Sequence, residues 1–168
     1  MKHATQRSAG IFLAQGGMVA ALYVALTLIA SAMGLASGQI QLRLSEALTI
    51  LPCFFPAAVP GLFVGCLLAN LLTGCVLWDV AVGSLATLLG ALGTRLLRKN
   101  RWLAVLPPIV SNILLVPPVL VWAYGMEESI PFLMLTVGLG EVLSCGVLGE
   151  LMYSALDKHR ALWDRKDR

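Results

Sequence analysis

The amino-acid sequence predicts an all-α integral membrane protein with six transmembrane helical segments, on the grounds of its composition, its sparse charges and the placement of its basic residues. Of the 168 residues, 58% are hydrophobic and only 12% are charged, and the mean hydropathy is +0.85. Soluble domains are about half apolar and about a quarter charged, so this composition excludes a soluble globular protein. Between Arg7 and Arg95 the charged side chains are Arg43, Glu46 and Asp79. Segments so poor in charge are typical of helices embedded in lipid.

Basic residues predict the orientation of the chain. All twelve lysines and arginines except Arg43 lie in three segments, at residues 2–7, 95–101 and 158–168. The positive-inside rule assigns such segments to the cytoplasm, so an even number of crossings separates each pair of them. Both termini are therefore expected in the cytoplasm. A net charge of +3 divided in this way indicates topology, and we expect no nucleic-acid partner.

The apolar runs divide into six helical segments of one domain, residues 1–168. They are expected at about residues 11–33, 46–59, 60–74, 79–97, 104–125 and 131–156. One long helix over residues 46–74 would leave a basic segment outside the cell, so the even number of crossings favours two short segments. Pro52, Pro56 and Pro60 support a break between them. Each short segment has about 14 residues, or roughly 21 Å, so a re-entrant hairpin of the same parity remains an alternative.

The first and fifth segments each have a second interpretation. The apolar run that ends at Ala30-Ser31-Ala32 resembles a secretory signal, but at about 20 residues it is longer than the roughly 7 to 15 of such signals, so we expect a retained helix. Proline pairs at residues 107–108 and 117–118 flank Asn112. They predict a broken helix that lines a cavity.

A polar segment precedes the second predicted helix and forms the first candidate binding site. Gln39, Gln41, Arg43 and Ser45 alternate with apolar residues, which predicts an extended segment at the external mouth. A purely local interpretation is also open, in which Ser45 caps the helix, Glu46 lies at its positive end and Arg43 neutralises Glu46. Arg43 is the single basic residue on the predicted external side, which favours a binding role.

Isolated polar side chains within the spans are further candidates, namely Asn70, Asp79, Asn112 and Glu141. A charge near the bilayer centre costs about 2.5 to 3.5 kcal/mol, so Glu141 is expected to face the bundle interior. Nine steps of about 100° put Glu150 on the opposite helix face, so these two carboxylates should not serve one pocket. Helix capping by Asp79, and satisfaction of freed carbonyls by Asn112, are the alternatives to ligand contact.

Aromatic residues and cysteines carry weaker signals. Trp122 and Tyr124 fit a belt at the membrane surface, although either can stack on a planar ligand. The cysteines lack metal-binding spacing, so we expect packing roles and neither a metal nor a cofactor on this chain; they are Cys53, Cys66, Cys75 and Cys145. HExxH, GxSxG and Walker A patterns are absent from the sequence, which disfavours an intramembrane enzyme.

Several motifs together resemble the QueT family of queuosine-precursor transporters. They are QIQLRLSEALTILP, PAAVPGLFVGCLLANLLTG, WDVAVGSLATLLGAL and LPPIVSNILL, and the resemblance covers about residues 15–150. Members of this family are substrate-binding S components of energy-coupling-factor (ECF) transporters. The resemblance implies a six-helix protein in a prokaryotic plasma membrane that captures a 7-deazaguanine precursor from outside. It also implies docking on a module of one transmembrane coupling subunit and two ATPase subunits, with Ala21 and Ala25 of the first helix at the interface.

The candidate residues suit this class of ligand. A 7-deazaguanine presents a ring N–H beside an exocyclic amine, which Glu46 or Glu141 can accept, while Arg43 or Asn112 can donate to its carbonyl. An aminomethyl form is a cation, for which Asp79 supplies a further acid. The alternatives are a solitary facilitator of a nucleobase-like or vitamin-like molecule and, less favoured, an intramembrane enzyme.

Overall fold

The structure is a computed structural model that describes residues 2–35 and 42–159, with side chains from residue 8 onward. Every regular element in these ranges is a helix, which agrees with the predicted all-α class. Four helices are long and apolar enough to span a membrane: Ser8–Ala32, Leu77–Leu96, Arg101–Tyr124 and Ile130–Asp157. Two shorter apolar helices, Leu44–Cys53 and Ala58–Leu72, lie between the first two of these in the chain.

The first half of the chain holds a long helix, two short ones and another long one. They are α1 (Lys2–Ala32), the 3-10 helix η1 (Leu44–Cys53), α2 (Ala58–Leu72) and α3 (Leu77–Leu96). The predicted break within residues 46–74 is present at residues 54–57, next to Pro52 and Pro56. Pro60 does not break the chain, because it lies in the first turn of α2, where no helical N–H is required.

The second half begins with α4 (Arg101–Ala104) and α5 (Leu106–Tyr124). The predicted break in the fifth segment is wrong at its second proline pair, because α5 continues through Pro117 and Pro118. A proline has a φ angle compatible with a helix, so the pair Pro117 and Pro118 removes helical hydrogen bonds without ending α5. The first pair lies at the start of α5, where proline is favoured.

The last predicted helix contains a π-helical segment that its sequence does not predict. It consists of α6 (Ile130–Glu141), the π-helical segment η2 (Val142–Leu148) and α7 (Gly149–Asp157). The prediction of an uninterrupted α-helix, on which the phase of Glu150 relative to Glu141 rested, is therefore wrong over seven residues. A π-helix bonds residue i to residue i+5, so it turns less per residue than an α-helix.

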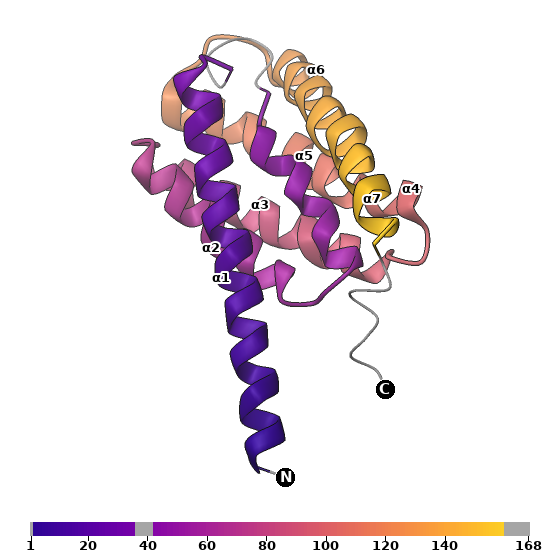
Figure 1. The fold of residues 1–168 in the computed structure, drawn as a ribbon. Coiled ribbons are helices and arrows are strands. Elements are labelled where there is room, and N and C mark those ends of the chain that lie inside the picture. Colours follow the sequence, from indigo (N-terminus) through magenta and orange to yellow (C-terminus); the bar gives the residue numbers. More distant parts are fainter. Residues whose placement is uncertain (1, 36–41, 160–168) are drawn as a thin grey trace.

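The helices form a bundle around η1 (Figure 1). Neighbouring helices pack in the order α1, α2, α3, α5 and α6, while η1 contacts α1, α3, η2 and α7. The start of α1 and the end of α7 lie toward the same side of the bundle, and the connection from α5 to α6 lies at the other (Figure 1). The N-terminal part of α1, a helix of 31 residues, projects beyond the bundle.

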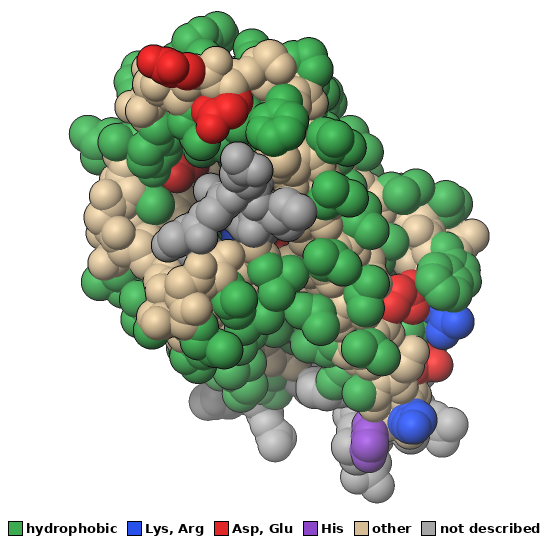
Figure 2. Space-filling model, turned by 90° about the horizontal axis from the view of Figure 1, so that it is seen from above, with side chains coloured by type: hydrophobic (Ala, Val, Ile, Leu, Met, Phe, Trp, Pro, Cys, Tyr) green, Lys and Arg blue, Asp and Glu red, His purple; other side chains and the backbone are tan. Residues whose placement is uncertain are grey.

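Glycines bring two pairs of these helices close together and so position the site. A Cβ atom added at Gly65 of α2 would lie 2.7 Å from Cβ of Tyr23 in α1. One added at Gly90 of α3 would lie 2.7 Å from Cα of Pro108 in α5. Large hydrophobic side chains such as Leu13, Leu77 and Leu96 are exposed on the helices, and few charged side chains lie on the face seen from above (Figure 2). This surface suits a lipid environment.

Candidate binding pocket

A cavity of about 440 Å³ lies between α1, the residues preceding η1, α2, α3 and α5. Its apolar lining includes Leu42, Leu120 and Met126. Its polar lining consists of Tyr23, Thr27, Ser31, Arg43, Ser45, Asn70, Thr73, Asp79 and Tyr124. The cavity thus brings together three predicted site residues, Arg43, Asn70 and Asp79, from three separate parts of the chain.

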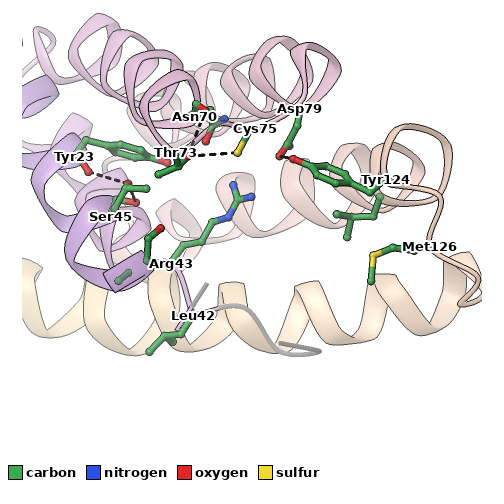
Figure 3. A pocket seen from close by; sticks show the side chains of 14 residues that line it. Tyr23, Leu42, Arg43, Ser45, Asn70, Thr73, Cys75, Asp79, Tyr124 and Met126 are labelled. Carbon is green, nitrogen blue, oxygen red and sulfur yellow. Dashed lines mark hydrogen bonds between the residues drawn. The ribbon is translucent and has the colours of Figure 1, made fainter. Parts of the chain in front are cut away.

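Arg43 supplies the positive charge of the pocket. Its backbone is extended (φ −94°, ψ 93°), as the alternating pattern predicted, and it immediately precedes η1. Its guanidinium points into the cavity (Figure 3). Asp79 and Glu46 act on it electrostatically, yet it forms no ion pair with any carboxylate of the described residues. A half-buried guanidinium without an ion pair among the described residues is suited to binding an acceptor on a ligand.

Asp79 supplies a carboxylate on the opposite wall. It lies in the first turn of α3 and is only 4% exposed. Its Oδ2 accepts a hydrogen bond of 2.8 Å from the Tyr124 hydroxyl, whereas its Oδ1 has no partner. The capping alternative for Asp79 is wrong, because Val76 is the N-cap of α3 and no side chain caps that end.

The turn between α2 and α3 explains why Asn70 and Asp79 lie together. Gly74, with a φ of 74°, reverses the chain after α2. A Cβ atom added at Gly83 would lie 3.1 Å from Nδ2 of Asn70 and 3.4 Å from Oδ1 of Asp79. The missing side chain at Gly83 therefore leaves room for an amide donor next to a carboxylate acceptor.

Glu46 lies behind the pocket wall and is fully buried. The Tyr23 hydroxyl donates a hydrogen bond to its Oε1, while its Oε2 has no partner. Ser45 does not cap this helix, because Arg43 is the N-cap of η1 and Ser45 instead accepts a hydrogen bond of 2.9 Å from Thr27. Glu46 does lie in the first turn of η1, and Arg43 acts on it electrostatically, as the local interpretation predicted.

A second layer of polar groups surrounds Glu46. One ligand atom each from Glu46, Glu141 and Cys145 lie within 4.8 Å of one another, and all three residues are buried. The Cys145 thiol donates a hydrogen bond of 3.2 Å to Oε2 of Glu141. Asn112 lies beside Glu141; its Nδ2 donates to the Pro108 carbonyl at 3.1 Å, as one alternative predicted, and its Oδ1 has no partner. We call Glu46, Asn112, Glu141 and Cys145 the inner cluster.

Other predicted site residues lie elsewhere. Trp122 is 81% exposed and does not line the cavity. Gln39 and Gln41 lie outside the described residues. Oε2 of Glu150 lies 3.7 Å from Nε of Arg101, and both residues line a separate groove. Glu141 and Glu150 therefore do not share a pocket, as expected, although the helical phase used to predict this was wrong.

The expected partner interface occupies a different surface from the pocket. Ala21 and Ala25 are both exposed on α1, whereas the adjacent Ala20 is buried. Residues four apart lie on the same face of a helix, so the two exposed alanines form one small-residue surface. We call this surface the alanine face.

Sequence reasoning missed several residues of the site. Tyr23 was not selected, although its hydroxyl in the middle of an apolar helix requires a buried partner, which is a usable signal. Cys145 was expected to be a packing residue, and nothing in its spacing indicated two carboxylates nearby. Thr27 and Thr73 were missed because a hydroxyl in a helix commonly bonds to its own backbone.

A comparison with protein families supplies an independent finding. The family model described as QueT transporter matches residues 13–158, which is most of the chain. No curated protein and no solved structure matches it at a significant level.

Proposed function

The chain belongs to the QueT transporter family, and from this premise we propose that it is the substrate-binding S component of an ECF-type importer for a queuosine precursor. Membership of a transporter family makes it a transport protein and not an enzyme. The observation that carries the proposal is one cavity lined by both the guanidinium of Arg43, which has no ion pair among the described residues, and Oδ1 of Asp79, which has no hydrogen-bond partner there.

The chemistry of a 7-deazaguanine fits this pair of groups. Its ring N–H and exocyclic amine are adjacent donors, which Asp79 can accept, and its carbonyl is an acceptor for Arg43. The Asn70 amide beside Asp79 offers an additional polar contact. A volume of about 440 Å³ suits a bicyclic molecule, since small-molecule sites begin at about 300 Å³.

The proposed orientation has six crossings and both termini in the cytoplasm. Four long helices and two short apolar ones support this number of segments. The cavity is bordered by Leu42 and Met126, which lie in the connections after α1 and after α5. In this orientation both connections are external, so the pocket receives its ligand from outside the cell.

Energy for uptake comes, in this proposal, from ATP hydrolysis on partner subunits. The alanine face supports docking on the transmembrane coupling subunit, because small side chains allow another helix to approach closely in lipid. No cofactor is required for binding. The alternative is a solitary facilitator, in which uptake follows a gradient and needs no ATPase.

Binding to the purified full-length protein tests the ligand assignment. Isothermal titration in detergent with 7-aminomethyl-7-deazaguanine should give a saturable one-to-one complex, and adenine, which lacks the carbonyl and the adjacent ring donor, should not compete. Failure of every 7-deazaguanine tested to bind would refute the proposed ligand class. Copurification of ATPase subunits after expression with the native membrane partners separates the ECF importer from the facilitator.

A further inference from the structure

We propose that a groove between α4 and the last helix binds one phospholipid whose headgroup ends in a primary amine, as in phosphatidylethanolamine. The groove has a volume of about 420 Å³ and shares no lining residue with the binding pocket. One wall comes from α4 and the other from η2 and α7, and α4 and α7 lie side by side (Figure 1). The inference concerns a lipid on the outside of the bundle, so it goes beyond the transported ligand.

Most of the groove is an apolar channel that suits an acyl chain. Val142 and Val147 of η2 and Leu151 of α7 line it, and all three are exposed. Gly146 also lines it, and a Cβ atom added there would meet only Val142 Cγ1, at 3.7 Å, so the glycine leaves this wall open. The wall is formed largely by the π-helical segment, a rare conformation that is frequent at functional sites.

The charged residues of the groove lie at one end, where two membrane spans meet the membrane surface. Arg101 begins the span Arg101–Tyr124, and Glu150 lies near the end of the span Ile130–Asp157. Trp102 lines the groove beside them and is 61% exposed, which is typical of a tryptophan at the headgroup level. A lipid in the groove therefore has its headgroup at Arg101 and Glu150 and its chain along η2.

Arg101 is placed to bind the phosphate of such a lipid. Its guanidinium carbon lies 4.7 Å from the centre of the Trp102 ring, a cation–π contact that orients the side chain. Its Nε lies 3.7 Å from Oε2 of Glu150, which is longer than a hydrogen bond, and its side chain is 43% exposed. The guanidinium can therefore donate to a phosphate oxygen without giving up its attraction to Glu150.

Glu150 is placed to bind the amine. Its Oε1 is buried and has no hydrogen-bond partner in the described part of the chain. Buried acceptors are nearly always paired, so this atom indicates a donor that comes from another molecule. A primary ammonium next to the phosphate supplies that donor and also a charge opposite to that of the carboxylate.

The charge balance of the groove favours this headgroup over two common alternatives. Arg101 and Glu150 together are neutral, so they complement one phosphate and one ammonium. Phosphatidylglycerol carries the phosphate but brings no cation to Glu150. Phosphatidylcholine carries a quaternary ammonium, which has no N–H to donate to Oε1. The unpartnered acceptor therefore distinguishes three lipids that are alike in their acyl chains.

Native mass spectrometry of the full-length protein released from lipid nanodiscs tests the inference. The nanodiscs contain equal amounts of phosphatidylethanolamine, phosphatidylcholine and phosphatidylglycerol with identical acyl chains. One phosphatidylethanolamine should remain bound in roughly 10-fold excess over each of the other two, the factor expected from a hydrogen bond to a charged group. Equal retention of the three lipids, or an excess of either of the others, overturns the inference.

Substitutions then locate the lipid. Glu150→Gln should reduce the excess over phosphatidylcholine to a few-fold at most, because the carboxylate charge is lost. Gly146→Leu keeps both charges but fills the groove, so it should reduce retention of all three lipids. Arg98→Gln is the matched control, since Arg98 is an exposed basic residue outside the groove, and it should change neither result. An unchanged excess in both groove variants would place the lipid elsewhere and overturn the inference.

Discussion

Tyr23 links the two layers of the binding site through a single side chain. Its ring lines the cavity, its hydroxyl donates to Glu46, and its Cβ is held against α2 by the absence of a side chain at Gly65. A tyrosine on an apolar helix is thus constrained at both ends. Because Glu46 is fully buried, Tyr23 supplies a donor that water cannot replace.

Replacement of Arg43 by Gln should weaken ligand binding by roughly 10- to 100-fold, because it removes a charge-assisted hydrogen bond to the ligand carbonyl. Folding should be little changed, since the guanidinium has no ion pair within the described chain. Calorimetric titration and the thermal midpoint of unfolding measure the two effects.

The matched control for Arg43 is Arg95→Gln. Arg95 Nη1 donates a hydrogen bond of 2.9 Å to the Pro52 carbonyl, far from the cavity lining. Loss of this hydrogen bond should lower the thermal midpoint of unfolding and leave the affinity for the ligand unchanged. If Arg43→Gln lowered only the thermal midpoint and Arg95→Gln lowered only the affinity, the binding role of Arg43 would be contradicted.

Replacement of Tyr23 by Phe should destabilise the protein, because it removes the hydrogen bond that Glu46 Oε1 accepts from the Tyr23 hydroxyl. An unsatisfied buried acceptor of this kind costs about 1 to 3 kcal/mol, more for a charged group. Thermal unfolding in detergent measures the loss. An unchanged midpoint would indicate that Glu46 is satisfied by another group.

At the scale of elements, close contacts at glycines determine how α2 packs against α1. Gly61 and Gly65 of α2 face α1, where an added Cβ would lie 2.6 Å from the carbonyl oxygen of Gly16 and 2.7 Å from the Cβ of Tyr23. Contacts of this kind depend on surface shape, since lipid provides no hydrophobic drive between helices. They set the distance between α1 and α2, and with it the position of the Tyr23 ring.

The substitution Gly65→Ala should lower stability by about 1 to 3 kcal/mol, because the added methyl group must displace backbone and side-chain atoms of α1. Thermal unfolding in detergent measures it. Gly17→Ala is the control, since nothing lies within 4 Å of a Cβ added there. Alanine also favours helix by about 0.5 to 1 kcal/mol over glycine, so this control should not lower the midpoint. Equal destabilisation by both would contradict the tight contact.

The elements differ in how far the sequence predicts them. The long apolar helices and the break near Pro52 and Pro56 follow from hydropathy and proline chemistry, which are local properties. The π-helical segment η2 could not be predicted, because nothing in VLSCGVL distinguishes it from an α-helix. Continuity of α5 through Pro117 and Pro118 was also unpredictable, since neighbouring helices decide whether a proline pair ends a helix.

The candidate site shows the same limit. Asp79 could be selected because an isolated charge in a membrane span is costly and therefore functional by default. Arg43 could be selected because it is the single basic residue on the predicted external side. Their common cavity, and the position of Glu46 behind Tyr23, depend on how four helices pack. One sequence carries no signal of such distances. Hence the sequence predicted the chemical groups but not their division into a pocket and an inner cluster.

At the scale of the whole molecule, the pocket and the alanine face are separate surfaces. The pocket lies toward the connections after α1 and α5, and the alanine face lies on the outside of α1. Binding and coupling can therefore be altered independently. This separation permits a test of docking in which ligand affinity serves as the internal control.

Ala21→Trp or Ala25→Trp should leave ligand binding by the isolated protein intact and abolish ATP-dependent uptake and copurification with the coupling subunit. A bulky side chain on this face prevents close approach of a partner helix but lies away from the cavity. Phe12→Trp, at a position 42% exposed on the opposite face of α1 from Ala21, should retain uptake. Normal uptake by both Ala21→Trp and Ala25→Trp would show that the docking surface lies elsewhere on the protein.

The length of α1 has a consequence for how the protein stands in its membrane. The apolar stretch Ser8–Ala32 has 25 residues, about 37 Å at 1.5 Å per residue, against a hydrocarbon thickness of about 30 Å. This positive mismatch is relieved when the helix tilts by roughly 37° or the bilayer thickens around it. Because Ala21 and Ala25 are rigid parts of the same helix, their inclination changes with lipid thickness. Acyl-chain length is thus a physical control on the angle at which this protein presents itself to its partner.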